Sequence, residues 1–451
     1  MKNLRNIWCL MLALCLVACG DNDDPKPAIT LLAANINGGT LVDGAAGVPV
    51  ESTVELVFSV ALDIPKFESS FSISSSAGEP VYDITYTNAS SKVVVEFTDL
   101  SYNTAYTVAV KAGAFGSNGQ ALQSDVSYTF TTQEDDVVRS MAPCTSASQY
   151  CYRTVTLQDN ANATGNLGFY ANYPIYLENA EWEDLEQAII VVHGANRDAD
   201  NYFTYLSSTL SGEQLQASTV LIAPEFKEGG SATDLTWGSN WREGQASNST
   251  AKLSSFEVID ALIQQLSDKE AFPALKKVIV TGHSSGALFA QVYGAANKVE
   301  GDSHLSFEYV VANSQYFYYP DNQRYDEQNN QFYTPTDCGT YNMWPMGYSG
   351  APTYVSSSTD AEIDANLLGR SFTYFLGNGN QADGALNTTN CAAVLLGSSR
   401  FSRGENIFRW LETEYAGQHN STKAIVEGIG HDGQGMYQSN EFKALLGELL
   451  Q

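Results

Sequence analysis

The sequence predicts a small all-β sandwich followed by a larger α/β domain with a doubly wound, mostly parallel sheet. Three observations predict this arrangement. The chain has 451 residues, which is enough for two or three domains. Residues 28–133 contain no Cys, His or Trp and show repeated apolar–polar alternation, as half-buried strands do. From residue 144 onward, short apolar runs alternate with amphipathic helical patterns, as in parallel sheets covered on both faces.

The first 18 residues have the pattern of a signal peptide. Lys2 and Arg5 provide the positive start, and the apolar run Ile7–Val17 is too short to span a bilayer as a mature helix. This run leads into LVACG, which resembles a bacterial lipobox. The resemblance implies a lipid on Cys19 and sorting to an outer membrane, because Gly rather than Asp follows Cys19. A plain secretory peptide is the alternative.

The composition limits the classes of partner. The net charge is −28 and no basic cluster interrupts the acidity, which argues against nucleic-acid binding. No CxxC or HExxH spacing suggests a metal site. The expected chemistry implies no metal and no organic cofactor. The hydrophobic content of 43% is sufficient for folded cores.

Four cysteines follow Cys19, namely Cys144, Cys151, Cys338 and Cys391. An even number in an exported chain predicts two disulfides. Three pairings are open. The most economical one joins Cys144 to Cys151 locally and Cys338 to Cys391 across a long loop.

Residues 19–27 are a polar tether, and residues 28–133 form the predicted sandwich. Apolar residues alternate here in VELVFSV, KVVVEF and AYTVAV, with Gly, Asn and Ser clusters between them. The segment resembles the bacterial Ig-like domain, which implies a spacer or a weak binding module. Residues 134–143 are the expected linker.

The predicted α/β domain covers residues 144–451. Its expected strands are residues 153–157, 167–175, 188–192, 219–223, 277–281, 307–312, 371–376 and 423–427. Its expected helices are residues 201–210, 253–266, 405–415 and 441–450, with a further helix directly after the strand at 277–281. In such a sheet the ligand site lies at the carboxyl ends of the strands.

One segment brings reactive chemistry to that edge. Gly282-His283-Ser284-Ser285-Gly286 stands between an apolar strand and a helix, which is the context that a nucleophile elbow requires. We expect a turn so sharp that only Gly fits two residues before and two residues after Ser284. The hydroxyl would then stand at the N-terminus of a helix whose first amides can stabilise an oxyanion.

The strand, motif and helix resemble those of the α/β-hydrolase superfamily. The resemblance implies a triad in the chain order Ser, acid, His, with the base after the last strand. His431 lies there, in a glycine-rich loop, and is the expected general base. His304 and His419 precede strands, and His283 lies within the elbow with its side chain expected to point away from Ser284.

The acid is expected after the strand that ends near residue 376. Asp383 is the first carboxylate in that loop, and Asp321, after the preceding strand, is the alternative. The family commonly has its acid nearer the strand end, where this chain has Asn378 or Asn380. Asp432 beside His431 is expected to point elsewhere.

The resemblance also implies an oxyanion hole made of two backbone amides. Ser285 follows the nucleophile and supplies the first. Ala195, in the sequence HGANRD after the strand at 188–192, is the candidate for the second. His193 is expected to brace this loop.

Aromatic residues near the predicted strand ends have two interpretations. Trp237, Trp241 and Trp344 are candidate substrate-binding residues at a cleft mouth. The alternative, slightly favoured, is that the aromatic residues pack the long segment after residue 312 against the sheet.

Together these features predict an exported, lipid-anchored serine hydrolase of the bacterial envelope that cleaves carboxylic esters, polymeric ones included. The alternatives are a serine peptidase or acyltransferase of the same fold, and a catalytically silent surface-binding protein.

Overall fold

The structure is a computed structural model that describes residues 28–450. The expected signal peptide, the lipidation site Cys19 and the tether lie outside the described residues. Within residues 28–450, no helix has the length and apolar character needed to cross a bilayer. The chain divides into two compact units, between Asp136 and Val137.

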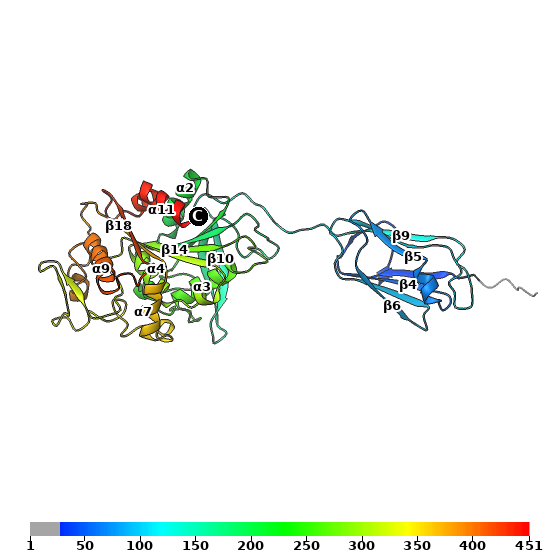
Figure 1. Ribbon diagram of the computed structural model, residues 1–451, viewed down its shortest axis with the longest axis horizontal. Coiled ribbons are helices and arrows are strands. Elements are labelled where there is room, and N and C mark those ends of the chain that lie inside the picture. Colours follow the sequence, from blue (N-terminus) through cyan, green and yellow to red (C-terminus); the bar gives the residue numbers. More distant parts are fainter. Residues whose placement is uncertain (1–27, 451) are drawn as a thin grey trace, which may run out of the picture. The chain divides into compact units, whose positions relative to one another are not determined.

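The first unit is a sandwich of two sheets (Figure 1). One sheet has the strand order β2-β1-β4-β7-β6 and the other has the order β3-β9-β8-β5. The elements are β1 (Leu31–Ile36), β2 (Gly39–Thr40), β3 (Ala45–Val48), β4 (Ser52–Phe58), α1 (Ile64–Glu68), β5 (Phe71–Ser75), β6 (Tyr82–Thr87), β7 (Lys92–Phe97), β8 (Ala105–Val110) and β9 (Val126–Thr132). The alternation seen in the sequence is the alternation of burial: along β4, Val54, Leu56 and Phe58 point into the core.

The second unit contains an eight-stranded sheet with the order β10-β11-β13-β12-β14-β15-β18-β19. β10, β11 and β13 pair antiparallel in that order, and every other pairing in this sheet is parallel. The strands are β10 (Tyr152–Gln158), β11 (Thr164–Ala171), β12 (Gln187–Val192), β13 (Thr219–Pro224), β14 (Lys277–His283), β15 (Ser306–Ala312), β18 (Phe372–Gly377) and β19 (Thr422–Val426). This is the doubly wound sheet that the sequence predicts.

Helices cover both faces of this sheet (Figure 1). α3 (Ser255–Leu266), α4 (Ser285–Ala296), α7 (Asp360–Gly369) and α9 (Arg400–Glu414) pack on one face. α2 (Ala199–Gly212), α10 (Gly433–Gln438) and α11 (Asn440–Leu449) pack on the other. Since both faces are covered, β12, β13 and β18 are buried along their whole length, which explains their continuous apolar sequences.

The remaining elements are short and lie in the connections. They are the 3₁₀ helix η1 (Ser239–Glu243), α5 (Val299–Asp302), the hairpin β16 (Arg324–Asp326) and β17 (Gln331–Tyr333), α6 (Thr353–Ser356) and α8 (Cys391–Val394). The sequence did not predict them, nor α7 and α10, because segments this short carry little periodicity. Ser254 and Glu257 form a capping box at the start of α3.

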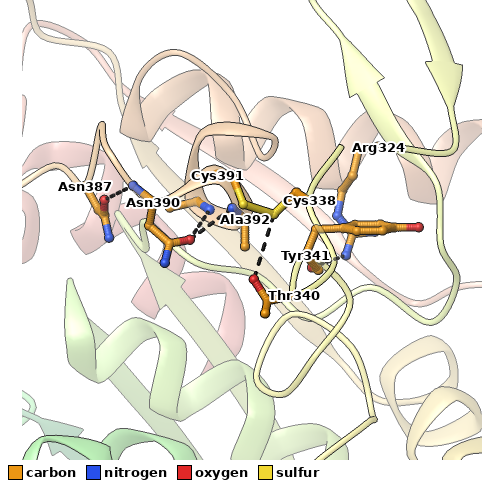
Figure 2. Close-up of a disulfide and its surroundings, with 9 residues drawn as sticks. Arg324, Cys338, Thr340, Tyr341, Asn387, Asn390, Cys391 and Ala392 are labelled. Carbon is orange, nitrogen blue, oxygen red and sulfur yellow. Dashed lines mark hydrogen bonds between the residues drawn. A yellow bond between two sulfur atoms is a disulfide. The ribbon is translucent and has the colours of Figure 1, made fainter. Parts of the chain in front are cut away.

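Both predicted disulfides are confirmed, Cys144 with Cys151 and Cys338 with Cys391. Figure 2 shows the second one, which joins the segment after β15 to the start of α8. Asn390 caps α8 by accepting hydrogen bonds from Ala392 and Ala393, at 2.9 and 3.3 Å (Figure 2). The connection that follows β18 is therefore fixed at its far end.

Candidate active site

Ser284 occupies the sharp turn that the sequence predicts. It has φ 61° and ψ −114°, a sparsely populated conformation for a residue other than Gly, and it stands between the end of β14 and the start of α4. The two glycines are required by close packing. A Cβ on Gly282 would lie 2.2 Å from the Gly286 carbonyl oxygen, and a Cβ on Gly286 would lie 2.1 Å from that of Val192. The turn has the backbone geometry expected of a nucleophile elbow.

His431 and Asp383 meet beside this elbow. The His431 Nδ1 atom lies 3.1 Å from the Asp383 Oδ1 atom. The His431 ring stacks on the ring of His283, the residue before Ser284, with centroids 5.0 Å apart. The chain thus brings together three segments far apart in the sequence: the end of β14, the connection after β18 and the loop after β19.

His283 also contacts a tyrosine. The Tyr202 hydroxyl lies 3.0 Å from His283 Nδ1, and the His283 side chain is buried. Burial lowers the pKa of His283 well below its usual value, and the neighbouring His431 lowers it further. His283 is therefore a neutral ring that stacks against the His431 ring.

A third residue, Arg400, joins the pair. Its Nε atom donates to the Asp383 Oδ2 atom at 2.8 Å, while Asp383 Oδ1 faces His431. Burial opposes ionisation of Asp383, but the Arg400 hydrogen bond and charge, with His431, outweigh it and lower the pKa of this carboxyl. Asp383 is thus held as a carboxylate, the form that can accept from His431.

Asn313 connects the strand ends around this cluster. It is buried, with φ 53°, directly after β15. Its side-chain oxygen accepts from the Gly377 amide at 2.7 Å, and its side-chain nitrogen donates to the Gly430 carbonyl at 2.8 Å. The loop that carries His431 is therefore tied to the ends of β15 and β18.

The loop after β12 is braced by His193, as expected. The Phe226 amide donates to His193 Nε2 at 3.1 Å, so Nδ1 carries the proton and donates to the Gly194 carbonyl at 2.8 Å. Burial lowers the pKa of His193 to about 4, which keeps the ring neutral. A Cβ on Gly194 would lie 3.9 Å from the Ser284 Cβ, so the loop runs close beside the nucleophile candidate.

The two amides expected to form an oxyanion hole belong to the residue after Ser284 and to the loop that runs beside it. Ser285 is the first residue of α4, where backbone amides have no partner within the helix. Ala195 follows Gly194 in the braced loop and is exposed. Their positions leave both amides as donor candidates for an anion above Ser284.

The other carboxylates considered from the sequence have different partners. Asp321 accepts from the Trp410 indole at 3.1 Å and from the Gln323 amide at 2.8 Å. Asp432 caps α10. Asn378, at the usual place of the acid, donates to Glu427 at 2.6 Å. Of Asp321, Asp383 and Asp432, Asp383 alone forms a hydrogen bond or ion pair with His431 within residues 28–450.

The three candidate tryptophans are buried rather than exposed at a cleft. Trp237 is 0% and Trp241 is 2% exposed, and both belong to the core on the α4 side of the sheet. Trp344 is 9% exposed, and its indole donates to the Glu243 carbonyl at 2.9 Å. This burial favours the packing interpretation over a role in substrate binding.

Sequence reasoning missed Arg400, Asn313 and a third residue, Arg242. The Arg242 guanidinium donates to the Ser285 hydroxyl at 3.2 Å, one residue beyond Ser284. One signal was present for Arg400. Arg400 and Arg403 open α9, where the helix dipole disfavours cations, so each needs a specific acceptor.

Two cavities lie against the Asp383–His431 pair. One of about 320 Å³ is lined by Asn378, Arg400 and the two paired residues, among others. A smaller one of about 230 Å³ lies between the loop at 381–385 and the loop at 429–432. Within residues 28–450, no group of three or more His, Cys, Asp or Glu side chains is placed to hold a metal ion.

Comparison with a family model supports the fold of the first unit. A family model described as the bacterial Ig-like domain matches residues 33–132. The second unit has an α/β-hydrolase-like fold. With the Ig-like domain, the two disulfides indicate an extracytoplasmic location.

Solved structures similar to this chain include three hydrolases. A poly(3-hydroxybutyrate) depolymerase from Bordetella parapertussis is 19% identical, with a TM-score of 0.45, over 64% of this chain and 87% of the other. Poly(aspartic acid) hydrolase-1 from Sphingomonas sp. KT-1 is 17% identical, with a TM-score of 0.47, over 69% of this chain and 100% of the other. A siderophore hydrolase from Aspergillus nidulans is 13% identical, with a TM-score of 0.36, over 67% of this chain and 95% of the other. No curated protein matches the sequence.

Proposed function

We propose that this protein is a serine hydrolase that cleaves carboxylic esters, with Ser284 as nucleophile, His431 as general base and Asp383 as the acid that orients His431. The observation that carries the proposal is the contact of Asp383 with His431 beside the strained turn at Ser284. Nucleophile, acid and base follow one another in the chain order that is typical of the α/β-hydrolase fold.

Each residue has a defined role in the reaction. His431 takes the proton from Ser284 as the oxygen attacks the ester carbonyl carbon. The amides of Ser285 and Ala195 donate to the negative oxygen of the tetrahedral intermediate. His431 then protonates the departing alcohol. A water molecule, deprotonated by His431, cleaves the acyl-enzyme and restores Ser284.

Asp383 acts through the imidazole. Its carboxylate accepts the Nδ1–H of His431, which leaves Nε2 unprotonated and able to receive the Ser284 proton. The same carboxylate stabilises the imidazolium that forms when the proton arrives.

The first test is active-site labelling. A fluorophosphonate probe is expected to label the wild-type chain and not Ser284→Ala, and wild type is expected to hydrolyse p-nitrophenyl acyl esters. Absence of labelling in wild type would contradict the proposal and favour a silent binding protein. Labelling without ester hydrolysis would move the proposal to a peptidase or an acyltransferase.

We extend the proposal to the cellular setting. Lipid attached at Cys19 would anchor the enzyme to the bacterial envelope, with the Ig-like unit between the anchor and the hydrolase unit. Extracellular esters, polymeric ones included, are then the substrates to test. Metabolic labelling with an alkynyl fatty acid is expected to mark the wild-type chain but not Cys19→Ala.

A further inference from the structure

Arg400 is a buried cation placed directly on the proposed acid. It is the first residue of α9 and is 5% exposed. Nε donates to Asp383 Oδ2 at 2.8 Å, and Nη1 donates to the Asn313 carbonyl at 3.2 Å. A buried guanidinium is costly unless a carboxylate compensates it. Asp383 is the only carboxylate recorded within ion-pair distance of it in residues 28–450.

Asp383 needs such a partner because its loop has no regular structure. It lies six residues beyond the end of β18, and the next element, α8, begins at Cys391. The carboxylate divides its two oxygens between partners. Oδ1 receives His431 Nδ1 at 3.1 Å and the Ala385 amide at 3.0 Å, while Oδ2 receives Arg400. Arg400 therefore sets which oxygen is presented to His431.

These contacts form a closed circuit. Arg400 contacts Asp383, Asp383 contacts His431, and the residue before His431 offers its carbonyl to the Asn313 side chain. The Asn313 main-chain carbonyl returns to Arg400. A displacement of the guanidinium would therefore act on the acid and on the loop of the base together.

We propose that Arg400 is a positioning residue for the hydrolysis: it fixes the Asp383 carboxylate in the orientation that holds His431, and its positive charge favours the neutral imidazole that accepts the Ser284 proton. The inference rests on the proposed function, because it assigns Arg400 a role through Asp383 and His431. The contact with Arg400 explains how Asp383, which lies six residues beyond the end of β18, can still orient His431.

The charges around His431 give the direction of the effect. Asp383 faces it from the loop after β18, Arg400 from α9, Asp432 from its own loop, and the neutral His283 from the elbow. Burial lowers the pKa of His431, Arg400 lowers it further, and the two carboxylates raise it. Because a general base works only when unprotonated, kcat/KM rises with pH through this pKa. Loss of the Arg400 charge should move that rise to higher pH.

Two substitutions separate charge from geometry. Arg400→Gln removes the positive charge and the hydrogen bond that holds Asp383. We therefore expect kcat to fall about 100-fold and the acidic limb of the pH profile of kcat/KM to move to higher pH. Arg400→Lys keeps the charge, but a lysine cannot reach Asp383 and the Asn313 carbonyl together. We therefore expect a lower kcat, with the acidic limb of the kcat/KM profile at the same pH as in wild type.

Arg403→Gln is the matched control. Arg403 is also buried and lies one helical turn further along α9, but it donates to three carbonyls, those of Gly397, Gln315 and Asn387. Its loss is expected to lower the melting temperature and to leave the acidic limb where wild type has it. A limb that moves equally in Arg403→Gln and Arg400→Gln would overturn the proposal.

A second readout does not need activity. In full-length Ser284→Ala, NMR follows the His431 ring proton during a pH titration, with the signal assigned by His431→Asn. Adding Arg400→Gln should raise the observed titration midpoint, and an unchanged midpoint would overturn the role of the charge. If Arg400→Gln does not fold, Arg400→Lys decides, since wild-type kcat in that variant would overturn the positioning role. A wild type without probe labelling would instead count against the proposed function, while the titration still tests the charge.

Discussion

At the scale of single residues, Asp383 is the position on which the proposed chemistry depends most. Asp383→Asn would keep the size of the side chain but lose the charge that orients His431 and compensates Arg400. We expect kcat to fall by about three to four orders of magnitude. We also expect the free energy of unfolding to fall by about 1–3 kcal/mol, because a buried cation is left unpaired. Steady-state kinetics and denaturant titration measure the two effects.

Asp321→Asn is the control for this experiment, since Asp321 is the alternative acid and contacts Trp410 and Gln323 instead. It should leave kcat within about twofold of wild type. A large loss of kcat in Asp321→Asn, together with little loss in Asp383→Asn, would instead identify Asp321 as the acid that orients His431.

At the scale of elements, the close packing of α4 against β12 at the elbow leaves no room for a side chain at Gly286. In Gly286→Ala the new methyl group would lie 2.1 Å from the Val192 carbonyl oxygen, so β12 and α4 would have to separate. We expect a loss of about 3 kcal/mol or more in stability and loss of probe labelling. Gly447→Ala, at an exposed position of α11 with open space around it, should stabilise the protein by about 0.5–1 kcal/mol. Thermal melts of the two variants side by side test the contrast.

Element by element, the sequence was most informative where burial imposes a simple pattern. Strands β12, β13 and β18 are buried on both faces, so continuous apolar runs identified them. The segment between β15 and β18 holds the hairpin β16–β17 and two helices, whose short lengths give no clear periodicity. Arg400 and Asn313 share a hydrogen bond although they lie 87 positions apart in the sequence, and a local pattern cannot reveal such a contact.

At the scale of the whole molecule, the two units have separate cores. The sandwich core is one cluster of buried side chains, and the two clusters on either face of the eight-stranded sheet hold no residue of the first unit. All residues assigned to the proposed chemistry lie in the second unit. The second unit should therefore fold without the sandwich and carry the proposed activity.

The start of a working fragment follows from contacts at the beginning of the second unit. Val138 exchanges backbone hydrogen bonds with Asn179 and Glu181, and Arg139 pairs with Glu181 at 3.2 Å. These contacts fall inside the segment 134–143 that the sequence marks as a linker. We expect a fragment of residues 133–451 to keep the kcat/KM of the full chain on soluble esters. A fragment of residues 144–451 should be less stable by roughly 1–2 kcal/mol, because it loses this added edge contact. Unfolding of both fragments in denaturant, with kinetics of each, checks the boundary, and a fragment of residues 133–451 without activity would show that the sandwich is needed for catalysis.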